Sequence, residues 1–312
     1  MSARTAARLA AAALLVAACG AHAQLFRTYL TSEGNDANPC SLQQPCRLLP
    51  AALAAVAAGG EVWMLDSANY NTGTVTIGKS VTVLAVPGVV GSIVALNGGP
   101  AILISANGLS VALRNVVIGP VAGGTAGTDG VSLTGASTLT IEKSLVARLP
   151  GSGINVYGTG VVRVSDTTLR GNGDDAIALV NGGRAVISGS RMLDNYRGVR
   201  AWSTLGSAIT TATVTDSVIS GGDEGVQVYT NVAATARVSV FRTTIERTTS
   251  ALVTYTNGSG TAELNFGGSL IANNNRPWYQ NGAGSVLLSL GNNQVVGSAL
   301  AGDGTKTPLP AQ

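Results

Sequence analysis

The sequence predicts an all-β protein, a parallel β-helix with three short strands per coil, about ten coils and an N-terminal α-helical cap. Three observations lead to this prediction: an internal repeat of 22 to 27 residues, valine- and isoleucine-rich runs between turns, and 41 glycines with only 11% charged residues. A single coil cannot bury its own apolar face, so successive coils must stack and the stack becomes the core. Propeller blades are longer, and leucine-rich repeats need a leucine and asparagine pattern that this chain lacks.

Two columns of residues define the repeat. The first contains the residues at which a strand begins, at intervals of 23, 23, 22, 27 and 26: Gly130, Gly153, Ala176, Gly198, Gly225 and Ala251. The second contains apolar residues that each follow a turn-prone residue by three positions: Ile118, Val146, Leu169, Met192, Ile219, Ile245, Ile271 and Val295. Within one period we expect strands over 153–157, 161–164 and around Leu169, with side chains alternating inward and outward.

The N-terminus has the pattern of a secretory signal peptide. Arg4 and Arg8 precede an apolar run, and Ala21-His22-Ala23 supplies the small residues that signal peptidase needs, so we expect residues 1–23 to be removed. This predicts an exported protein, extracellular or periplasmic. A lipoprotein anchored at Cys19 stays open as the alternative, because a lipobox-like Val-Ala-Ala precedes that cysteine. No other apolar run reaches the ~20 residues of a transmembrane helix.

The charge and the rare residues exclude several classes of function. Removing residues 1–23 leaves 19 − 2 = 17 basic and 16 acidic residues, a formal charge of +1, so we expect no nucleic-acid partner. It also removes His22, the only histidine, and with it any imidazole for a catalytic triad or a zinc site. The two remaining cysteines, Cys40 and Cys46, are expected to form a disulfide in an oxidising compartment. No oligomerisation signal is visible, and we expect a monomer.

The predicted organisation has four parts: the signal peptide over 1–23, an N-terminal cap with a disulfide loop and a helix over 24–60, the β-helix over 61–297, and a C-terminal tail over 298–312. The cap begins with an apparent strand over 25–30, and its alanine-rich helix is expected over 47–58. An apolar helix in this position can cover the open end of a solenoid, which would otherwise expose its core and its strand edges. Upstream of Gly98, short strands are expected over 61–65, 74–77, 81–85 and 93–96.

These features together resemble a known superfamily. The run from Tyr29 to Cys40, then Pro45-Cys46-Arg47, the alanine-rich helix and the repeats resemble exported bacterial members of the pectin-lyase-like superfamily. The resemblance covers nearly all of the sequence after the signal peptide and implies a right-handed parallel β-helix. The superfamily contains polysaccharide lyases, hydrolases, epimerases, phage tailspikes and proteins without known activity, so the fold alone does not assign a function.

Stacking places equivalent residues of successive coils side by side, so a functional groove should be visible as columns. Two outward columns of the first strand combine hydrogen-bonding and aromatic side chains: Asn155, Arg200 and Gln227 in one, and Tyr157, Trp202, Tyr229 and Tyr255 in the other. Such side chains bind sugar rings, so we expect polysaccharide to bind here. The alternative is that the aromatic side chains stack on one another and only support the sheet. Longer turns after Trp202, Tyr229 and Tyr255 would form one wall of the groove.

Carboxylates and arginines gather beside these columns in the middle coils. Calcium-assisted lyase action is the enzymatic hypothesis, with Ca2+ held by Asp174, Asp175, Asp223 and Glu224 and with Arg197 or Arg200 as the base. The resemblance implies this role for an arginine, as in pectate lyases. The alternative is that the carboxylates pair with Arg197 across neighbouring coils. We also expect Asp175 and Glu224 at the surface, so that replacing both by alanine would hardly change stability.

A second enzymatic hypothesis is weaker. Gly173-Asp174-Asp175 resembles the paired-aspartate segment of polygalacturonases, and Thr128-Asp129-Gly130 resembles their upstream aspartate motif. Asp129 and Asp175 are, however, two coils apart instead of one, ~9.6 Å, at the edge of the range for inverting hydrolysis. The downstream histidine motif of that family has no counterpart here. The sequence therefore favours an exported protein that binds polysaccharide along its first-strand face, with lyase action as the accompanying hypothesis. A non-catalytic structural, surface-display or adhesion protein is the competing class.

Overall fold

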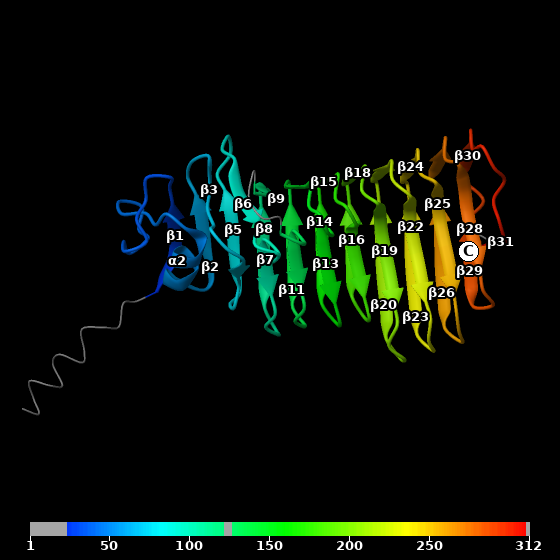
Figure 1. Ribbon diagram of the computed structural model, residues 1–312, viewed down its shortest axis with the longest axis horizontal. Coiled ribbons are helices and arrows are strands. Elements are labelled where there is room, and N and C mark those ends of the chain that lie inside the picture. The colour runs from blue at the N-terminus through cyan, green and yellow to red at the C-terminus, as the bar shows by residue number, and fades with distance from the viewer. Residues whose placement is uncertain (1–23, 122–126, 310–312) are drawn as a thin grey trace, which may run out of the picture.

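The computed structural model describes residues 24–121 and 127–309. They form a solenoid whose strands lie side by side along one axis, with helix α2 near one end and strands β30 and β31 at the other (Figure 1). The predicted signal peptide, residues 1–23, lies outside the described residues, and so does the alternative lipid-bearing Cys19. Within the described residues no helix is long and apolar enough to span a membrane.

Three parallel sheets run along the solenoid, and each coil from β2 to β28 contributes a strand to each of them in the order A, B, C. Sheet A has twelve strands: β1 (Leu25–Leu30), β2 (Val56–Met64), β5 (Val81–Ala85), β8 (Ser110–Arg114), β11 (Thr138–Glu142), β14 (Val161–Ser165), β17 (Arg184–Ser188), β20 (Ile209–Thr215), β23 (Thr235–Phe241), β26 (Thr261–Gly267), β29 (Ser285–Ser289) and β31 (Lys306–Pro308).

Sheet B has ten strands: β3 (Ala68–Asn69), β6 (Gly91–Ala95), β9 (Val116–Pro120), β12 (Leu145–Ala147), β15 (Thr168–Arg170), β18 (Arg191–Leu193), β21 (Val218–Ser220), β24 (Thr244–Glu246), β27 (Leu270–Ala272) and β30 (Gln294–Val296). Sheet C has nine: β4 (Val75–Thr76), β7 (Ile102–Ile104), β10 (Val131–Leu133), β13 (Ile154–Tyr157), β16 (Asp175–Val180), β19 (Arg197–Ser203), β22 (Glu224–Thr230), β25 (Ser250–Thr256) and β28 (Arg276–Asn281). The predicted three-strand coil is thus confirmed.

Both predicted columns are confirmed by the strand register. In sheet B, Val146 pairs with Leu169, which pairs with Met192, and the column continues to Val295. In sheet C, the residues that follow the strand starts pair in the same way, as Val131 does with Ile154. These apolar side chains point inward and are buried, except that Val295 in the last coil is only partly buried, so the stacked coils form one continuous core.

Between β8 and β27, each turn from sheet A to sheet B contains one residue with a positive φ, such as Asp166 at 49° and Asp216 at 51°. The residue after it is a buried serine or threonine in most coils, and its hydroxyl bridges coils. The Ser217 hydroxyl donates to the carbonyl of Thr215 at 2.7 Å and accepts from the N–H of Ser190 in the preceding coil at 3.2 Å. This ladder satisfies backbone groups that the sharp turn would otherwise leave unpaired inside the protein.

Replacing Ser217 by alanine should therefore lower the free energy of unfolding by about 1–3 kcal/mol, because the buried N–H of Ser190 loses its partner. Denaturant unfolding followed by circular dichroism measures this loss. Thr213→Ala, on the outer face of β20, is the control and should change the midpoint little. Equal losses in the two variants would show that the ladder adds nothing specific.

The cap differs in detail from the sequence prediction. Helix α2 spans Leu49–Ala55, whereas a helix over 47–58 was expected. Val56 is already extended and pairs with Leu25, so the last three residues of the predicted helix belong to β2. Gly59 has a φ of 79°, which an α-helix does not allow. Strand β2 therefore crosses the predicted boundary at residue 60, and β31 lies within the predicted tail.

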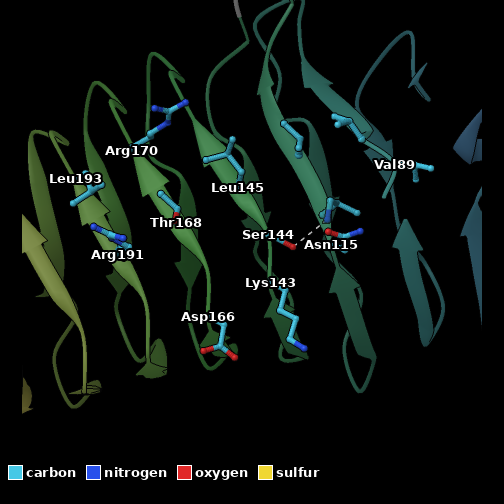
Figure 2. A pocket seen from close by; sticks show the side chains of 13 residues that line it. Val89, Asn115, Lys143, Ser144, Leu145, Asp166, Thr168, Arg170, Arg191 and Leu193 are labelled. Atoms are coloured by element: carbon cyan, nitrogen blue, oxygen red, sulfur yellow. Dashed lines mark hydrogen bonds between the residues drawn. The ribbon is translucent and has the colours of Figure 1, made fainter. Parts of the chain in front are cut away.

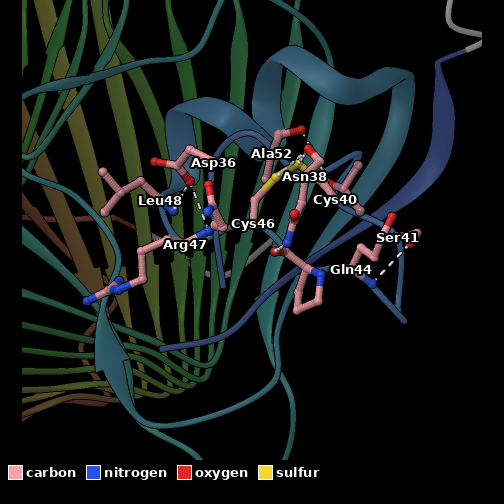
Figure 3. Close-up of a disulfide and its surroundings, with 12 residues drawn as sticks. Asp36, Asn38, Cys40, Ser41, Gln44, Cys46, Arg47, Leu48 and Ala52 are labelled. Atoms are coloured by element: carbon pink, nitrogen blue, oxygen red, sulfur yellow. Dashed lines mark hydrogen bonds between the residues drawn. A yellow bond between two sulfur atoms is a disulfide. The ribbon is translucent and has the colours of Figure 1, made fainter. Parts of the chain in front are cut away.

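A disulfide between Cys40 and Cys46 closes the loop before the helix, as predicted (Figure 3). Both cysteines are buried in the core cluster beside Ala52. Asp36 accepts hydrogen bonds from the backbone N–H groups of Arg47 and Leu48 at 2.9 and 2.8 Å, which fixes the chain just before α2. The helix in turn buries Leu49, Ala52 and Leu53. The cap is thus packed onto the end of the solenoid.

Candidate functional site: the outer face of sheet C

The predicted site residues lie on the outer face of sheet C, between β13 and β25. Pairing places Asn155, Ala178, Arg200 and Gln227 in one column. The neighbouring column contains five outward residues: Tyr157, Val180, Trp202, Tyr229 and Tyr255. The structure therefore brings the predicted residues together, but Ala178 and Val180 interrupt both columns in β16. Neither position was among the site residues predicted from the sequence.

Three of the aromatic side chains form a continuous stack. The rings of Tyr229 and Tyr255 are nearly parallel, with centroids 5.2 Å apart, and Trp202 packs against Tyr229 at 6.2 Å with a tilt of 54°. All three are half-buried. This is the mutual stacking that the sequence left open as an alternative. Tyr157 lies apart from this aromatic stack, two coils from Trp202, and is 43% exposed.

Several polar atoms on this face have no hydrogen-bond partner within the described part of the chain. They include the buried Trp202 Nε1 and Asn155 Oδ1. Asn155 does use its amide nitrogen, which donates to Asp129 at 3.2 Å. Buried polar groups in proteins are nearly always paired with protein or water. Among the described residues, Trp202 Nε1 and Asn155 Oδ1 are thus buried without the partner that such groups normally have.

Beside the aromatic stack lies an acid–arginine cluster, formed by Asp174, Asp175, Arg197, Arg200 and Glu224. Arg197 is at its centre: its Nη1 contacts Oδ1 of both aspartates at 2.8 Å, and its Nε lies 3.2 Å from Glu224. Arg200 Nε lies 2.9 Å from the other oxygen of Asp175, without the alignment of a good hydrogen bond. The pairing of carboxylates with Arg197 across neighbouring coils, the alternative left open by the sequence, is thus what the structure contains.

The cluster is largely shielded from solvent. The Asp175 side chain is 0% exposed, and those of Arg197 and Arg200 are 14% and 16% exposed. The expectation that Asp175 lies at the surface is therefore wrong: two long arginine side chains from the next coil cover it. Burial raises the pKa of Asp175 to about 6, against the opposing charges of Arg200 and Arg197. Burial likewise raises the pKa of Glu224 to about 6, against the charge of Arg197.

Small residues in β16 make room for this arrangement. Ala178 is the outward neighbour of Arg200, and it is only 1% exposed because larger side chains of the adjacent coils surround it. Arg200 can therefore reach across β16 to Asp175, while its guanidinium also lies 4.6 Å from the centre of the Trp202 ring. A single arginine thus links the acid–arginine cluster to the aromatic stack.

The four carboxylates predicted as calcium ligands do not fit a calcium ion in this arrangement. Calcium takes six to eight oxygen ligands, typically. Here Asp174, Asp175 and Glu224 all contact Arg197, whose charge occupies the position between them. Among the described residues, no group of three or more acidic, histidine or cysteine side chains is arranged to hold a metal ion. Calcium binding stays a prediction, and it would require Arg197 to move.

Comparison with known proteins agrees with the observed fold. The family model for the right-handed beta helix region matches residues 100–300. Among solved structures, the pectate lyase Pel9A shares 15% identity over 90% of this chain and 79% of its own, with a TM-score of 0.53. XylC in complex with xylose shares 8% identity over 86% of this chain and 68% of its own, with a TM-score of 0.56.

At these identities the two structures show a shared fold. A search of curated proteins found no match to this chain. The family model covers more than half of the sequence, and the three-sheet coil agrees with it. The chain belongs to the right-handed β-helix family.

Proposed function

We propose that this protein binds polysaccharide along the outer face of sheet C, with the glycan running lengthwise over β13 to β25. The observation that carries this proposal is the aromatic stack beside a column of polar side chains. Trp202, Tyr229 and Tyr255 are held in register by parallel pairing, and the amide of Gln227 lies in the adjacent column. Aromatic rings beside hydrogen-bonding groups suit the mixed apolar and polar surface of a sugar.

The stacking of Tyr229 on Tyr255 determines which parts of these rings a glycan can contact. Tyr229 and Tyr255 cover each other's faces, so a ligand meets ring edges and phenol hydroxyls. Both side chains are half-buried, so part of each ring stays accessible to a ligand. Tyr157 is the most exposed ring of the column and can contact the C–H face of a sugar. Within the acid–arginine cluster, Asp175 holds Arg200, whose guanidinium packs on the Trp202 ring.

The charge of this face favours a neutral glycan. Five carboxylates, Asp129, Asp174, Asp175, Asp223 and Glu224, lie in or beside the columns that contain the three basic residues Arg197, Arg200 and Arg276. Like charges facing each other across an interface cost free energy, so a polyuronate without a bridging cation is disfavoured here. The proposed ligand class is therefore a neutral polysaccharide.

Binding is better supported than calcium-assisted lyase action. For lyase action, Arg197 or Arg200 would have to leave its carboxylate partners to remove a proton, and the carboxylates would have to turn to a metal ion. Binding needs neither rearrangement. The competing class, a non-catalytic structural or adhesion protein, shares the rigid solenoid but predicts no glycan contact on this face.

The experiment is incubation of the purified protein with neutral and acidic polysaccharides, with calcium or with a chelator. Sedimentation measures binding, and mass spectrometry identifies any soluble products. We expect binding of at least one neutral polysaccharide, unchanged by chelator and without products. If unsaturated oligosaccharides form and their formation stops with chelator, the protein is a calcium-dependent lyase and the proposal of binding alone is wrong. Absence of binding to every neutral polymer would favour the structural alternative.

A further inference from the structure

A second surface, on the outer face of sheet B, has the opposite character. A groove of about 610 Å3 crosses β9, β12, β15 and β18 (Figure 2). Its floor is formed by the outward side chains of Val117, Leu145 and Thr168, which belong to one column of the sheet and are half-buried. Val89 and Val90, in the longer turn before β6, form its upstream end.

Basic side chains surround this groove. Lys143 lies at the turn into sheet B, Arg170 at the end of β15 and Arg191 at the start of β18, and all three are exposed (Figure 2). None of the three has a carboxylate within 4.0 Å in residues 24–121 and 127–309, although eight other arginines of the chain do. The one acid in the lining, Asp166, leaves the groove with a net charge of 3 − 1 = +2.

The groove is elongated along the solenoid. From β9 to β18 it spans three steps between coils, or about 14 Å at ~4.8 Å per step. Arg191 follows Val117, Leu145 and Thr168 in their column, whereas Arg170 lies in the next column, between Ala147 and Leu193. The basic side chains are therefore spread along the edges and the downstream end of the apolar strip formed by Val117, Leu145 and Thr168.

We propose that this basic groove binds a second glycan, an anionic polysaccharide whose carboxylate or sulfate groups contact Lys143, Arg170 and Arg191. Guanidinium groups bind carboxylate and sulfate oxygens through paired, charge-assisted hydrogen bonds. The apolar strip suits the C–H faces of an extended sugar chain. This goes beyond the proposed function, because the outer face of sheet C is acidic and is proposed for a neutral glycan. The same rod would thus hold two chemically different polymers on two faces.

The test is the binding of polygalacturonate to the intact protein, measured by biolayer interferometry without added divalent cations. The double substitution Arg170→Gln with Arg191→Gln should weaken binding about tenfold. Binding of the unchanged protein should also weaken as salt is raised from ~0.05 M to ~0.5 M, because the contacts are exposed charges.

The matched control is Arg163→Gln with Arg184→Gln. These two arginines are also exposed and lie in the same coils, but on the outer face of sheet A. The control removes the same net charge and should leave binding almost unchanged. Equal weakening in both double variants would overturn the proposal in favour of non-specific attraction, and so would absence of polygalacturonate binding by the unchanged protein.

Two further measurements separate this proposal from others. Tyr229→Ala, on sheet C, should leave polygalacturonate binding intact, so that failure of the neutral-glycan site does not affect the result. Double-stranded DNA should bind much more weakly than polygalacturonate at equal salt. Equal or tighter binding of DNA would overturn the assignment to a glycan.

Discussion

Replacing Asp175 by alanine should lower the free energy of unfolding by about 3 kcal/mol or more. The substitution removes a buried carboxylate and leaves Arg197 and Arg200, both mostly buried, without one of their partners. Breaking a buried ion pair costs about 3–5 kcal/mol, because the remaining charge has lost water and gains nothing in return. Arg197 keeps Asp174 and Glu224, so we expect the lower part of that range. Denaturant unfolding measures the loss.

The control for this prediction is Asp216→Ala. Asp216 also pairs with an arginine of the next coil, Arg242, with Nε 2.7 Å from Oδ1, but both side chains are more than half exposed. Exposed ion pairs contribute little, so the unfolding midpoint should hardly move. If Asp175→Ala were as mild as this control, the acid–arginine cluster would be a surface feature, as the sequence suggested.

The stability of the unchanged protein should fall as the pH rises from about 4 to about 6. Burial raises the pKa of Asp175 to about 6, whereas its value in the unfolded chain is near 4. Between these values the folded state holds a proton that the unfolded state has lost, so raising the pH favours unfolding. Two pKa units correspond to at most about 3 kcal/mol for Asp175. Glu224, with its pKa raised to about 6, adds to the same trend.

Unfolding by urea at a series of pH values, in the unchanged protein and in Asp175→Asn with Glu224→Gln, measures this effect. The difference between the two proteins isolates the two carboxyl groups from all the others. Burial raises the pKa of both carboxyl groups, and the amides that replace them do not titrate. The double variant should therefore lose the decline between pH 4 and pH 6. A decline of equal size in both proteins would show that other groups cause it.

Much of the fold was predictable because the repeat itself carries the register. Gly153, Ala176 and Gly198 recur at nearly constant intervals, and parallel strands of adjacent coils must then pair residue by residue. Turn residues such as Asp166 marked the change from one sheet to the next, because aspartate tolerates a positive φ. The end of α2 was harder to predict from the sequence, since the alanines there occur in helices and in strands and the pairing of Val56 with Leu25 decides between them.

The site was predictable only in part. The columns that contain Arg200, Trp202 and Tyr229 followed from the repeat, but their contacts did not. Burial of Asp175 depends on the direction in which the arginines of the next coil lean, and a column alignment does not contain that information. A signal was nevertheless present: Ala178 is the one small residue between Asn155 and Arg200, and a gap of this kind gives a long neighbour room to fold over. The basic groove was missed because only the first-strand columns were aligned in detail.

The most direct test of the central claim is titration of the protein with a soluble neutral oligosaccharide, taken from a polymer that it binds. Calorimetry would compare the unchanged protein with Tyr229→Ala and with Tyr196→Ala, an exposed tyrosine outside the aromatic stack that lies against Arg197. We predict that Tyr229→Ala weakens binding about tenfold or more, and that Tyr196→Ala leaves it within about twofold. Unchanged affinity in Tyr229→Ala would contradict the assignment of the glycan to the outer face of sheet C.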